Sequence, residues 1–227
     1  MFELPIFPLN TVLFPGMPVR LHIFEQRYRE MFEHVLGTNR TFGINLIRKG
    51  QEALGPLPEP YETGCTARIS GVERLDDGTF NATVIGDERF RILRLGAGQS
   101  YMTAFVESAP LQAHHTLEMV RGVRRLRPRL VRYLAMLARY VNEDEEGGTD
   151  LDIDLTGLQL PEDPMMLLYL AAALLQIPSI EKQPLLEADT AALLLQKVQQ
   201  LYRRELALLP PLAEVSEEQA RVSAWVN

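Results

Sequence analysis

This 227-residue sequence has no pair of cysteines and no long apolar run, which excludes a disulfide within the chain and a membrane-spanning helix. Its only cysteine is Cys65, so no disulfide can form within the chain, which is typical of proteins in a reducing cytoplasm. The longest apolar run, 165–177, is interrupted by Gln176 and is shorter than the roughly 20 residues that cross a bilayer. The first residues do not combine a basic segment with an apolar one, as secretory signals do. We therefore expect a cytoplasmic protein with no membrane partner.

The sequence also lacks the patterns of nucleotide hydrolysis and covalent catalysis. No glycine-rich string ends in Gly-Lys-Ser or Gly-Lys-Thr, the pattern that cradles phosphates in many ATPases. Only three lysines occur, Lys49, Lys182 and Lys197, and none lies beside an evident nucleophile. Cys65 falls in a predicted strand without a histidine nearby, so we expect a buried thiol. Because no nucleophile, base and orienting group assemble, we predict a non-enzymatic protein with no catalytic residues and no cofactor.

Two short patterns suggest metal binding, and neither is sufficient. His114 and His115 are adjacent, but a zinc site needs three or four ligands at suitable spacing and the other histidines are distant in sequence. Asp150, Asp152 and Asp154 resemble the start of a calcium loop without its required glycine and glutamate. We therefore predict no metal site.

Charge is unevenly distributed along this acidic chain of net charge −7. Seven arginines and no acid occur between 121 and 139, whereas 143–154 holds seven acids and no base. Four of the arginines could bind RNA phosphates, pair with the acidic loop, or form a solvated helix face: Arg121, Arg124, Arg125 and Arg132. No aromatic residues are interleaved for base stacking and the net charge is unfavourable, so nucleic acid is the less favoured partner.

Residues 1–110 have the pattern of a β-rich unit with one inserted helix. Apolar residues alternate over 17–23, the period of a half-buried strand, and then recur at helical spacing from Tyr28 to Leu36. Gly37 is expected to end this helix in a left-handed conformation. The other predicted strands are 42–47, 64–75, 79–85, 89–95 and 101–107, with Asp76-Asp77-Gly78 as a hairpin turn between the second and third of these.

Residues 111–210 read as an α-helical bundle, followed by a tail over 211–227. The first helix is predicted from Thr116 to about Asn142, with Pro128 bending or dividing it. The next, 164–177, is apolar on nearly every face and is therefore expected to be buried. Asp189 is the predicted N-cap of a last helix ending near Leu209. The fold class is thus α+β, a small β pseudo-barrel followed by helices.

Several motifs follow one another in an order that composition does not dictate. The opening Leu4-Pro-Ile-Phe-Pro-Leu9 leads into the Pro15-Gly16 turn, a strand and a helix. Three motifs come later in the chain: Gly64-Cys-Thr-Ala-Arg-Ile69, Val84-Ile-Gly-Asp-Glu-Arg-Phe-Arg-Ile92 and Lys182-Gln-Pro-Leu-Leu-Glu187. Their order resembles that of the N-terminal, substrate-binding domain of the ATP-dependent protease Lon. The resemblance covers 2–108 well and 160–208 loosely, and includes none of Lon's ATPase or peptidase parts. It implies a pseudo-barrel of the pseudouridine synthase and archaeosine transglycosylase (PUA-like) type with an appended bundle.

The resemblance implies a stand-alone, non-enzymatic module that holds unfolded or tagged protein segments as an adaptor or holdase. Its expected partners are those segments, a separate protease or chaperone, and a second copy of the chain. A groove for apolar segments, with strand addition at a barrel edge, is expected around the Pro15-Gly16 turn. Barrel core is the default interpretation of aromatic residues at strand spacing, and part of the candidate set could instead line this groove: Phe14, Pro15, Met17, Phe24, Arg27 and Tyr28. The alternative function is RNA binding through the barrel and the arginine-rich helix.

Overall fold

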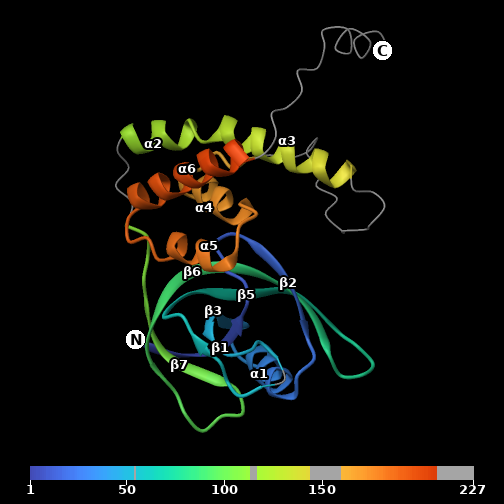
Figure 1. Ribbon diagram of the computed structural model, residues 1–227. Helices are drawn as coiled ribbons and strands as arrows, with labels where there is room; N and C mark the ends of the chain where they lie inside the picture. Colours follow the sequence, from blue (N-terminus) through green and yellow to red (C-terminus); the bar gives the residue numbers. More distant parts are fainter. Residues whose placement is uncertain (54, 113–116, 144–159, 209–227) are drawn as a thin grey trace.

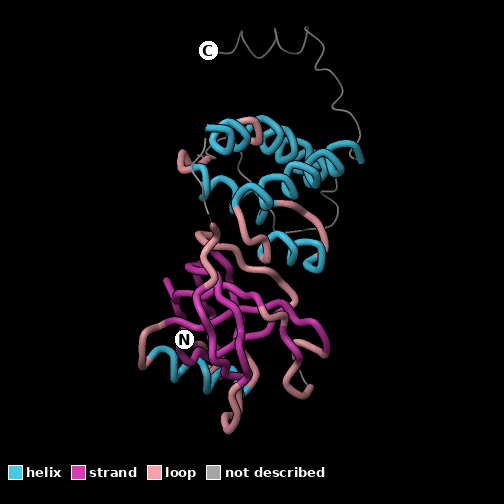
Figure 2. Tube along the Cα trace, turned by 90° about the vertical axis from the view of Figure 1, so that its left-hand side faces the viewer, coloured by secondary structure: helices cyan, strands magenta, loops and turns pink. Residues whose placement is uncertain are grey.

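The chain folds as a β-barrel with a layer of helices stacked on one end (Figures 1 and 2). The structure is a computed structural model and describes residues 1–53, 55–112, 117–143 and 160–208. The predicted α+β class, with strands first and helices afterwards, is confirmed. Within the described residues, no helix is long and apolar enough to cross a membrane.

Seven strands build the barrel in the described part of the chain. Their bounds are β1 Phe2–Leu9, β2 Pro18–Ile23, β3 Thr41–Lys49, β4 Glu59–Pro60, β5 Thr63–Arg74, β6 Phe80–Leu95 and β7 Met102–Ser108. Five of them close a ring in the order β1-β7-β6-β5-β3, because β1 also pairs in parallel with β3. The short β4 extends the sheet beyond β3, and β2 pairs with β6.

β1 changes its partner along its length. Phe2 to Ile6 pair with β7, whereas Ile6 to Leu9 pair with β3. Its two prolines, Pro5 and Pro8, therefore lie where β1 has a strand on one side only, and a missing N–H is tolerated there.

β6 is one continuous strand of 16 residues, and the prediction of two strands, 79–85 and 89–95, is wrong. Gly86 continues the strand because its backbone bonds to the Pro15-Gly16 turn that precedes β2. Its N–H donates to Met17 O at 2.9 Å, and its carbonyl accepts from Gly16 N at 2.8 Å. On one side of β6, β2 pairs with residues 80–85 and β7 pairs with residues 90–95. One strand thus has two successive partners on the same side.

The helix α1, Gln26–Leu36, packs on the barrel end away from the other helices (Figure 1). The predicted apolar stripe is confirmed, because Tyr28, Met31, Phe32 and Val35 are all buried. Gly37 follows the helix in a right-handed conformation, with φ −78°, so the prediction of a left-handed Gly37 is wrong. The left-handed residue is Arg40, with φ 59°.

The predicted hairpin between β5 and β6 is confirmed. Gly78 has φ 79°, a conformation that glycine adopts at little cost, and Leu75 N donates to Thr79 O at 2.9 Å. The Asp77 carboxylate accepts from the backbone N–H and the hydroxyl of Thr79, at 2.9 and 2.7 Å. These hydrogen bonds lower the pKa of Asp77 below its ordinary value.

The remaining helices form the bundle: α2 Leu117–Arg124, α3 Arg127–Glu143, α4 Pro164–Leu174, α5 Ser179–Leu186 and α6 Ala191–Leu208. The division of the first predicted helix is confirmed, with Pro128 in the first turn of α3. Asp163 caps α4 as expected, accepting from Met165 N and Met166 N. Asp189 does not cap α6, because the helix begins two residues later and the Thr190 hydroxyl accepts from Leu193 N at 3.2 Å.

The barrel and the bundle are fastened together by apolar packing and by buried polar side chains. Val12, Phe14 and Leu46 of the barrel part lie in the same apolar cluster as the bundle helices. Arg89 is 4% exposed and donates both to Ala109 O and to Ala188 O, which joins β6 to the segment after α5. Because the two parts share a core, the division near residue 110 stays a prediction.

Several predictions fall outside the described residues. These are the Thr116 cap, the His114-His115 pair, the acidic segment with Asp150, Asp152 and Asp154, and the tail 211–227.

We expect Gly86→Ala to destabilise the fold by about 2 kcal/mol, since overpacking a tight site costs this much. A Cβ atom at Gly86 would lie 2.2 Å from the Phe14 carbonyl oxygen, so the turn must move. Gly71→Ala is the matched control, because the nearest atom to its Cβ would be 3.9 Å away. Urea unfolding of both variants measures the difference, and equal stabilities would contradict this account of β6.

Candidate functional site

The candidate site is an opening in the barrel wall between β1 and β2. β2 pairs with β6 from Pro18 opposite Ile85 to Ile23 opposite Phe80, and its other edge pairs with no strand of the described residues. On the facing side, β3 is the one strand among those described that pairs with β1 beyond Ile6. The unpaired edges of two strands therefore border the same space.

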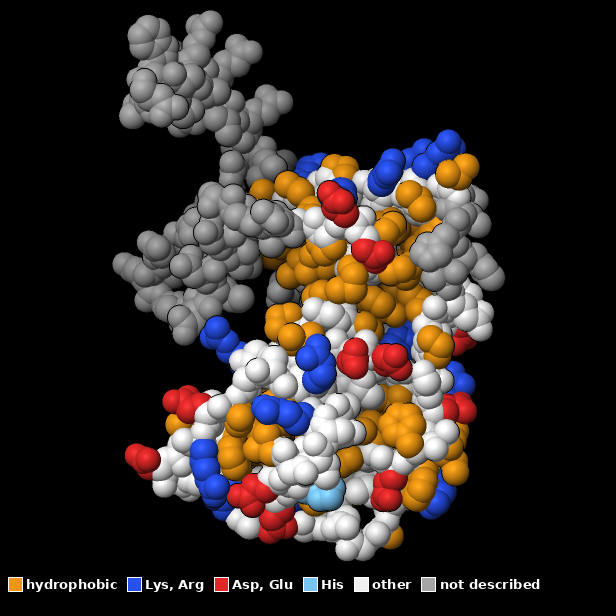
Figure 3. Space-filling view, turned by 180° about the vertical axis from the view of Figure 1, so that it is seen from behind, with side chains coloured by type: hydrophobic (Ala, Val, Ile, Leu, Met, Phe, Trp, Pro, Cys, Tyr) orange, Lys and Arg blue, Asp and Glu red, His pale blue; other side chains and the backbone are white. Residues whose placement is uncertain are grey.

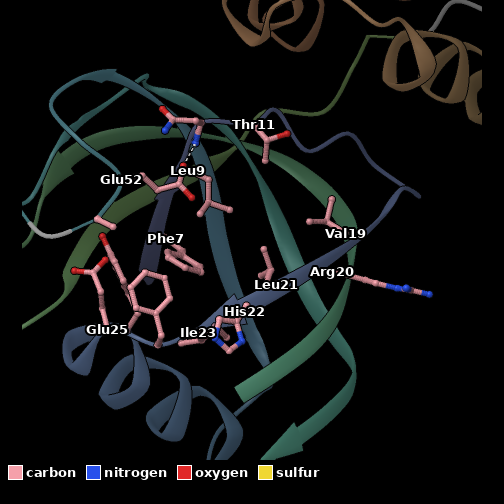
Figure 4. A pocket seen from close by; sticks show the side chains of 14 residues that line it. Phe7, Leu9, Thr11, Val19, Arg20, Leu21, His22, Ile23, Glu25 and Glu52 are labelled. Carbon is pink, nitrogen blue, oxygen red and sulfur yellow. Dashed lines mark hydrogen bonds between the residues drawn. The ribbon is translucent and has the colours of Figure 1, made fainter. Parts of the chain in front are cut away.

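A cavity of about 390 Å³ occupies this space, and we call it the β1–β2 cleft. Apolar residues from both strands dominate its wall, and the N-terminus of α1 with the loop after β3 supplies the polar rim (Figure 4). The lining residues are Phe7, Leu9, Asn10, Thr11, Val19, Arg20, Leu21, His22, Ile23, Phe24, Glu25, Tyr28, Glu52 and Ala53.

The apolar wall follows from the alternation of β2. Leu21 and Ile23 are buried and Val19 is half-buried, whereas Arg20 and His22 are exposed, and Arg20 extends away from the barrel in Figure 4. On β1, Phe7 and Leu9 face the same cavity. The cleft thus offers a row of apolar side chains on each border.

Phe24 lies at the mouth of the cleft and is 49% exposed. Its ring stacks on His22, with centroids 5.9 Å apart and planes at 21°. An aromatic ring left half in water at the entrance of an apolar cleft is available for contact with a ligand.

The polar rim is held in place by hydrogen bonds. Glu52 accepts from Asn10 N at 2.8 Å, and Asn10 O accepts from the Ser179 hydroxyl at 2.8 Å, which connects the rim to α5. Arg27 pairs with Glu25 at 2.9 Å and donates to Gly55 O at 2.9 Å.

Tyr28 is buried at the base of the cleft, with its ring 4.4 Å from that of Phe7. Its hydroxyl is buried without a hydrogen-bond partner in the described structure. Burial raises the pKa of Tyr28 to about 12; the nearby Arg27 acts in the opposite direction, and Glu25 and Glu52 add to the rise.

The six residues predicted for a peptide groove do not all meet. Phe24 and Tyr28 line the cleft, and Arg27 lies beside it with its guanidinium 4.8 Å from the Tyr28 ring centroid. Phe14 is 1% exposed and packs against Tyr169 of α4, so it contributes to the shared core instead. Pro15 and Met17 are half-buried outside the cleft lining.

Sequence reasoning missed the strand residues that form most of the cleft. The alternation of 17–23 predicted which side chains of β2 face inward, but not that one edge of this strand is unpaired. Phe7 and Leu9 belong to a strand interrupted by prolines, and Glu52 belongs to a loop. No local pattern signals the position of these residues.

The four arginines of the RNA-binding alternative lie on the bundle, away from the cleft. Arg121 and Arg125 line one hollow and Arg124 lines another, while Arg132 is exposed on α3. Among the described residues, no three His, Cys, Asp or Glu side chains are grouped to hold a metal. Cys65 is buried as expected, and burial raises its pKa to about 12.

The fold and the cleft define a barrel-and-bundle α+β protein with an open strand edge among the described residues, and solved structures share the fold. One is a Lon N-terminal domain protein from Xanthomonas campestris, which matches at a TM-score of 0.55 and 20% identity over 92% of this chain and all of the other. Another is the N-terminal domain of a Mycobacterium avium complex Lon protease. It matches at a TM-score of 0.64 and 18% identity, over 89% of this chain and 98% of the other.

Sequence relatives indicate the same family. The chain is 26% identical over 210 residues to Lon protease 2 of Syntrophobacter fumaroxidans and 29% over 189 residues to Lon protease 2 of Herpetosiphon aurantiacus. These matches cover 91% and 82% of this chain, which spans about a quarter of each relative, 25% and 22%. The family model of the ATP-dependent protease La (LON) substrate-binding domain matches residues 3–204. The chain belongs to this family, as the motif order predicted.

We expect Tyr28→Phe to be as stable as the wild type or about 1 kcal/mol more stable at pH 7, since it removes a buried hydroxyl without a partner. The raised pKa favours the neutral phenol in the folded state. Wild-type stability should therefore fall as the pH rises from 10 towards 12, and the variant should lose less. Urea unfolding at pH 7 and pH 11 measures both effects. A clear loss of stability at pH 7 would mean that the hydroxyl has a partner.

Proposed function

We propose that the chain binds extended, apolar segments of other polypeptides in the β1–β2 cleft. One observation carries this proposal: the edge of β2 that faces away from β6 pairs with no strand that the structure describes, and this edge borders an apolar cavity that opens to solvent. A segment lying along β2 would form main-chain hydrogen bonds with the free edge. Its alternate side chains would enter the cleft between Phe7, Leu9 and Leu21.

This mode of binding suits clients of varied sequence. Main-chain hydrogen bonds are the same for every residue except proline, so affinity comes from the backbone and preference from the cavity. The cavity volume is near the lower end of the roughly 300–1,000 Å³ of ligand pockets, which limits it to a few side chains. Selection should therefore rest on a short apolar motif that folded proteins bury and unfolded proteins expose.

The family supports a recognition role. The matched family model is that of a substrate-binding domain, which fits a non-catalytic module, and the relatives are named as proteases. We infer that the chain holds apolar segments for a partner protease or chaperone, as an adaptor or holdase. Weak binding at each cleft would gain from avidity if partners or several chains engage one client.

RNA binding is less favoured as a function of the barrel. The cleft has no lysine and one arginine in its lining, Arg20, which extends away from the barrel, and Glu25 and Glu52 lie at the rim. Negative charge at a site opposes the approach of phosphates.

Fluorescence anisotropy with a labelled, extended apolar peptide tests the proposal. We expect Phe24→Ala to weaken binding about tenfold, because truncating an aromatic contact removes 1 kcal/mol or more. Phe2→Ala is the matched control, since Phe2 is 48% exposed but lies outside the cleft, and it should bind like the wild type. Equal losses in the two variants, or no binding of denatured proteins and apolar peptides at about micromolar concentration, would reject the proposal.

Strand addition makes a second prediction about the client. In a paired strand, alternate N–H groups point towards the neighbouring strand, so N-methylation should abolish binding at every second peptide position only. A series of singly N-methylated peptides measured in the same assay gives the pattern. If the affinity does not alternate with the position of the N-methyl group, the peptide binds through its side chains without main-chain hydrogen bonds to β2, and strand addition is rejected.

A further inference from the structure

A second hollow lies on the bundle, between the junction of α2 with α3 and the helix α6. Its volume is about 710 Å³, and we call it the arginine groove. The lining residues are Leu117, Arg121, Gly122, Arg125, Arg129, Leu195 and Gln199. In Figure 1, α2 and α3 lie at the end of the molecule away from the barrel, and Figure 3 shows Lys and Arg side chains along this upper edge.

The groove is cationic without internal compensation among the described residues. Arg121, Arg125 and Arg129 form no ion pair there, and the other lining side chains are neutral. Arginines elsewhere do pair with acids, as Arg74 does with Glu33 and Arg204 with Glu181. In a chain of net charge −7, three guanidiniums that cluster with no acid among the described lining residues form a local site for an anionic partner.

The groove has a fixed floor. A Cβ atom at Gly122 would lie 2.6 Å from Leu195 Cδ2, so the absence of a side chain allows α2 to pack closely on α6. Gln199 Nε2 donates to Gly122 O at 3.2 Å across this contact. Arg125 N donates to Arg121 O at 3.1 Å, which keeps both arginines on one helical turn. The arginines of α2 therefore project from a helix whose position is fixed by its packing on α6.

We propose that the arginine groove docks an acidic, leucine-containing segment of a protein partner. Carboxylates would pair with the guanidiniums, whose planar fork matches a carboxylate with two parallel hydrogen bonds. Leu117, which is 75% exposed at the groove, would be covered by an apolar side chain of the same segment.

This mixed lining favours a peptide over a nucleic acid. A phosphate backbone has nothing apolar to cover Leu117, and the groove contains no aromatic side chain on which a base could stack. The groove lies on the bundle and the β1–β2 cleft on the barrel, so the two sites are separate. Docking of a partner here would leave the cleft open to clients.

The test uses the full chain and a labelled helical peptide that carries glutamates one turn apart and leucines on the adjacent face. We expect the double variant Arg121→Gln, Arg125→Gln to bind about tenfold more weakly, the effect of losing charge-assisted hydrogen bonds. Arg68→Gln is the matched control: it changes an exposed arginine of β5, far from the groove in the chain, and should bind like the wild type. Added salt should weaken wild-type binding, because salt screens exposed charges.

Three further arms make the test decisive. The same peptide with glutamine in place of glutamate should not bind. An RNA oligonucleotide of equal charge that binds as tightly as the peptide would overturn the proposal in favour of a general polyanion site. In a third arm, the seven acids of 143–154 are changed to the corresponding amides. If the peptide binds only to this variant, the chain's own acidic segment fills the groove in the wild type, and the proposal of a partner is overturned. No binding of the acidic peptide to the wild type would also overturn the proposal.

Discussion

The structure depends on the two successive partners that share one side of β6. β2 pairs with residues 80–85 and β7 with residues 90–95 of this strand. The ring closes through β7 alone, because β7 continues onto β1 and β2 does not. As a consequence, one edge of β2 lies beside an apolar cavity and pairs with no strand in the described part of the chain. Gly86, bonded to Gly16 and Met17 where the partners change, holds this arrangement.

The parts of the fold with a local signature were predictable from the sequence. The period of two over 17–23 and the helical spacing after it identified β2 and α1, and Asp76-Asp77-Gly78 identified a hairpin. β1 has no such signature, because prolines cannot donate to a strand ladder and the change of partner at Ile6 that accommodates them is not visible in the sequence. The sequence predicts two strands in place of β6 because a glycine within a strand pattern normally indicates a break. In the structure, the Pro15-Gly16 turn, distant in sequence, bonds to Gly86 and the strand continues.

The candidate site was harder to predict than the fold, for a physical reason. Aromatic residues at strand spacing can face a core or a cleft, and the difference is set by which strand edges meet. Phe14 lies in the core shared with the bundle, whereas Phe24 lies at the cleft mouth. The arginine-rich helix was recognised from composition, but its groove depends on Gly122 packing against Leu195, a contact between segments far apart in sequence.

Amide hydrogen exchange of β2 tests the central claim most directly. If an apolar segment adds to the free edge, alternate amides within 19–23 that exchange quickly in the free protein should become protected when the peptide binds. The amides already bonded to β6 should change little. Protection confined to the bundle helices, with β2 unaffected by bound peptide, would contradict the account.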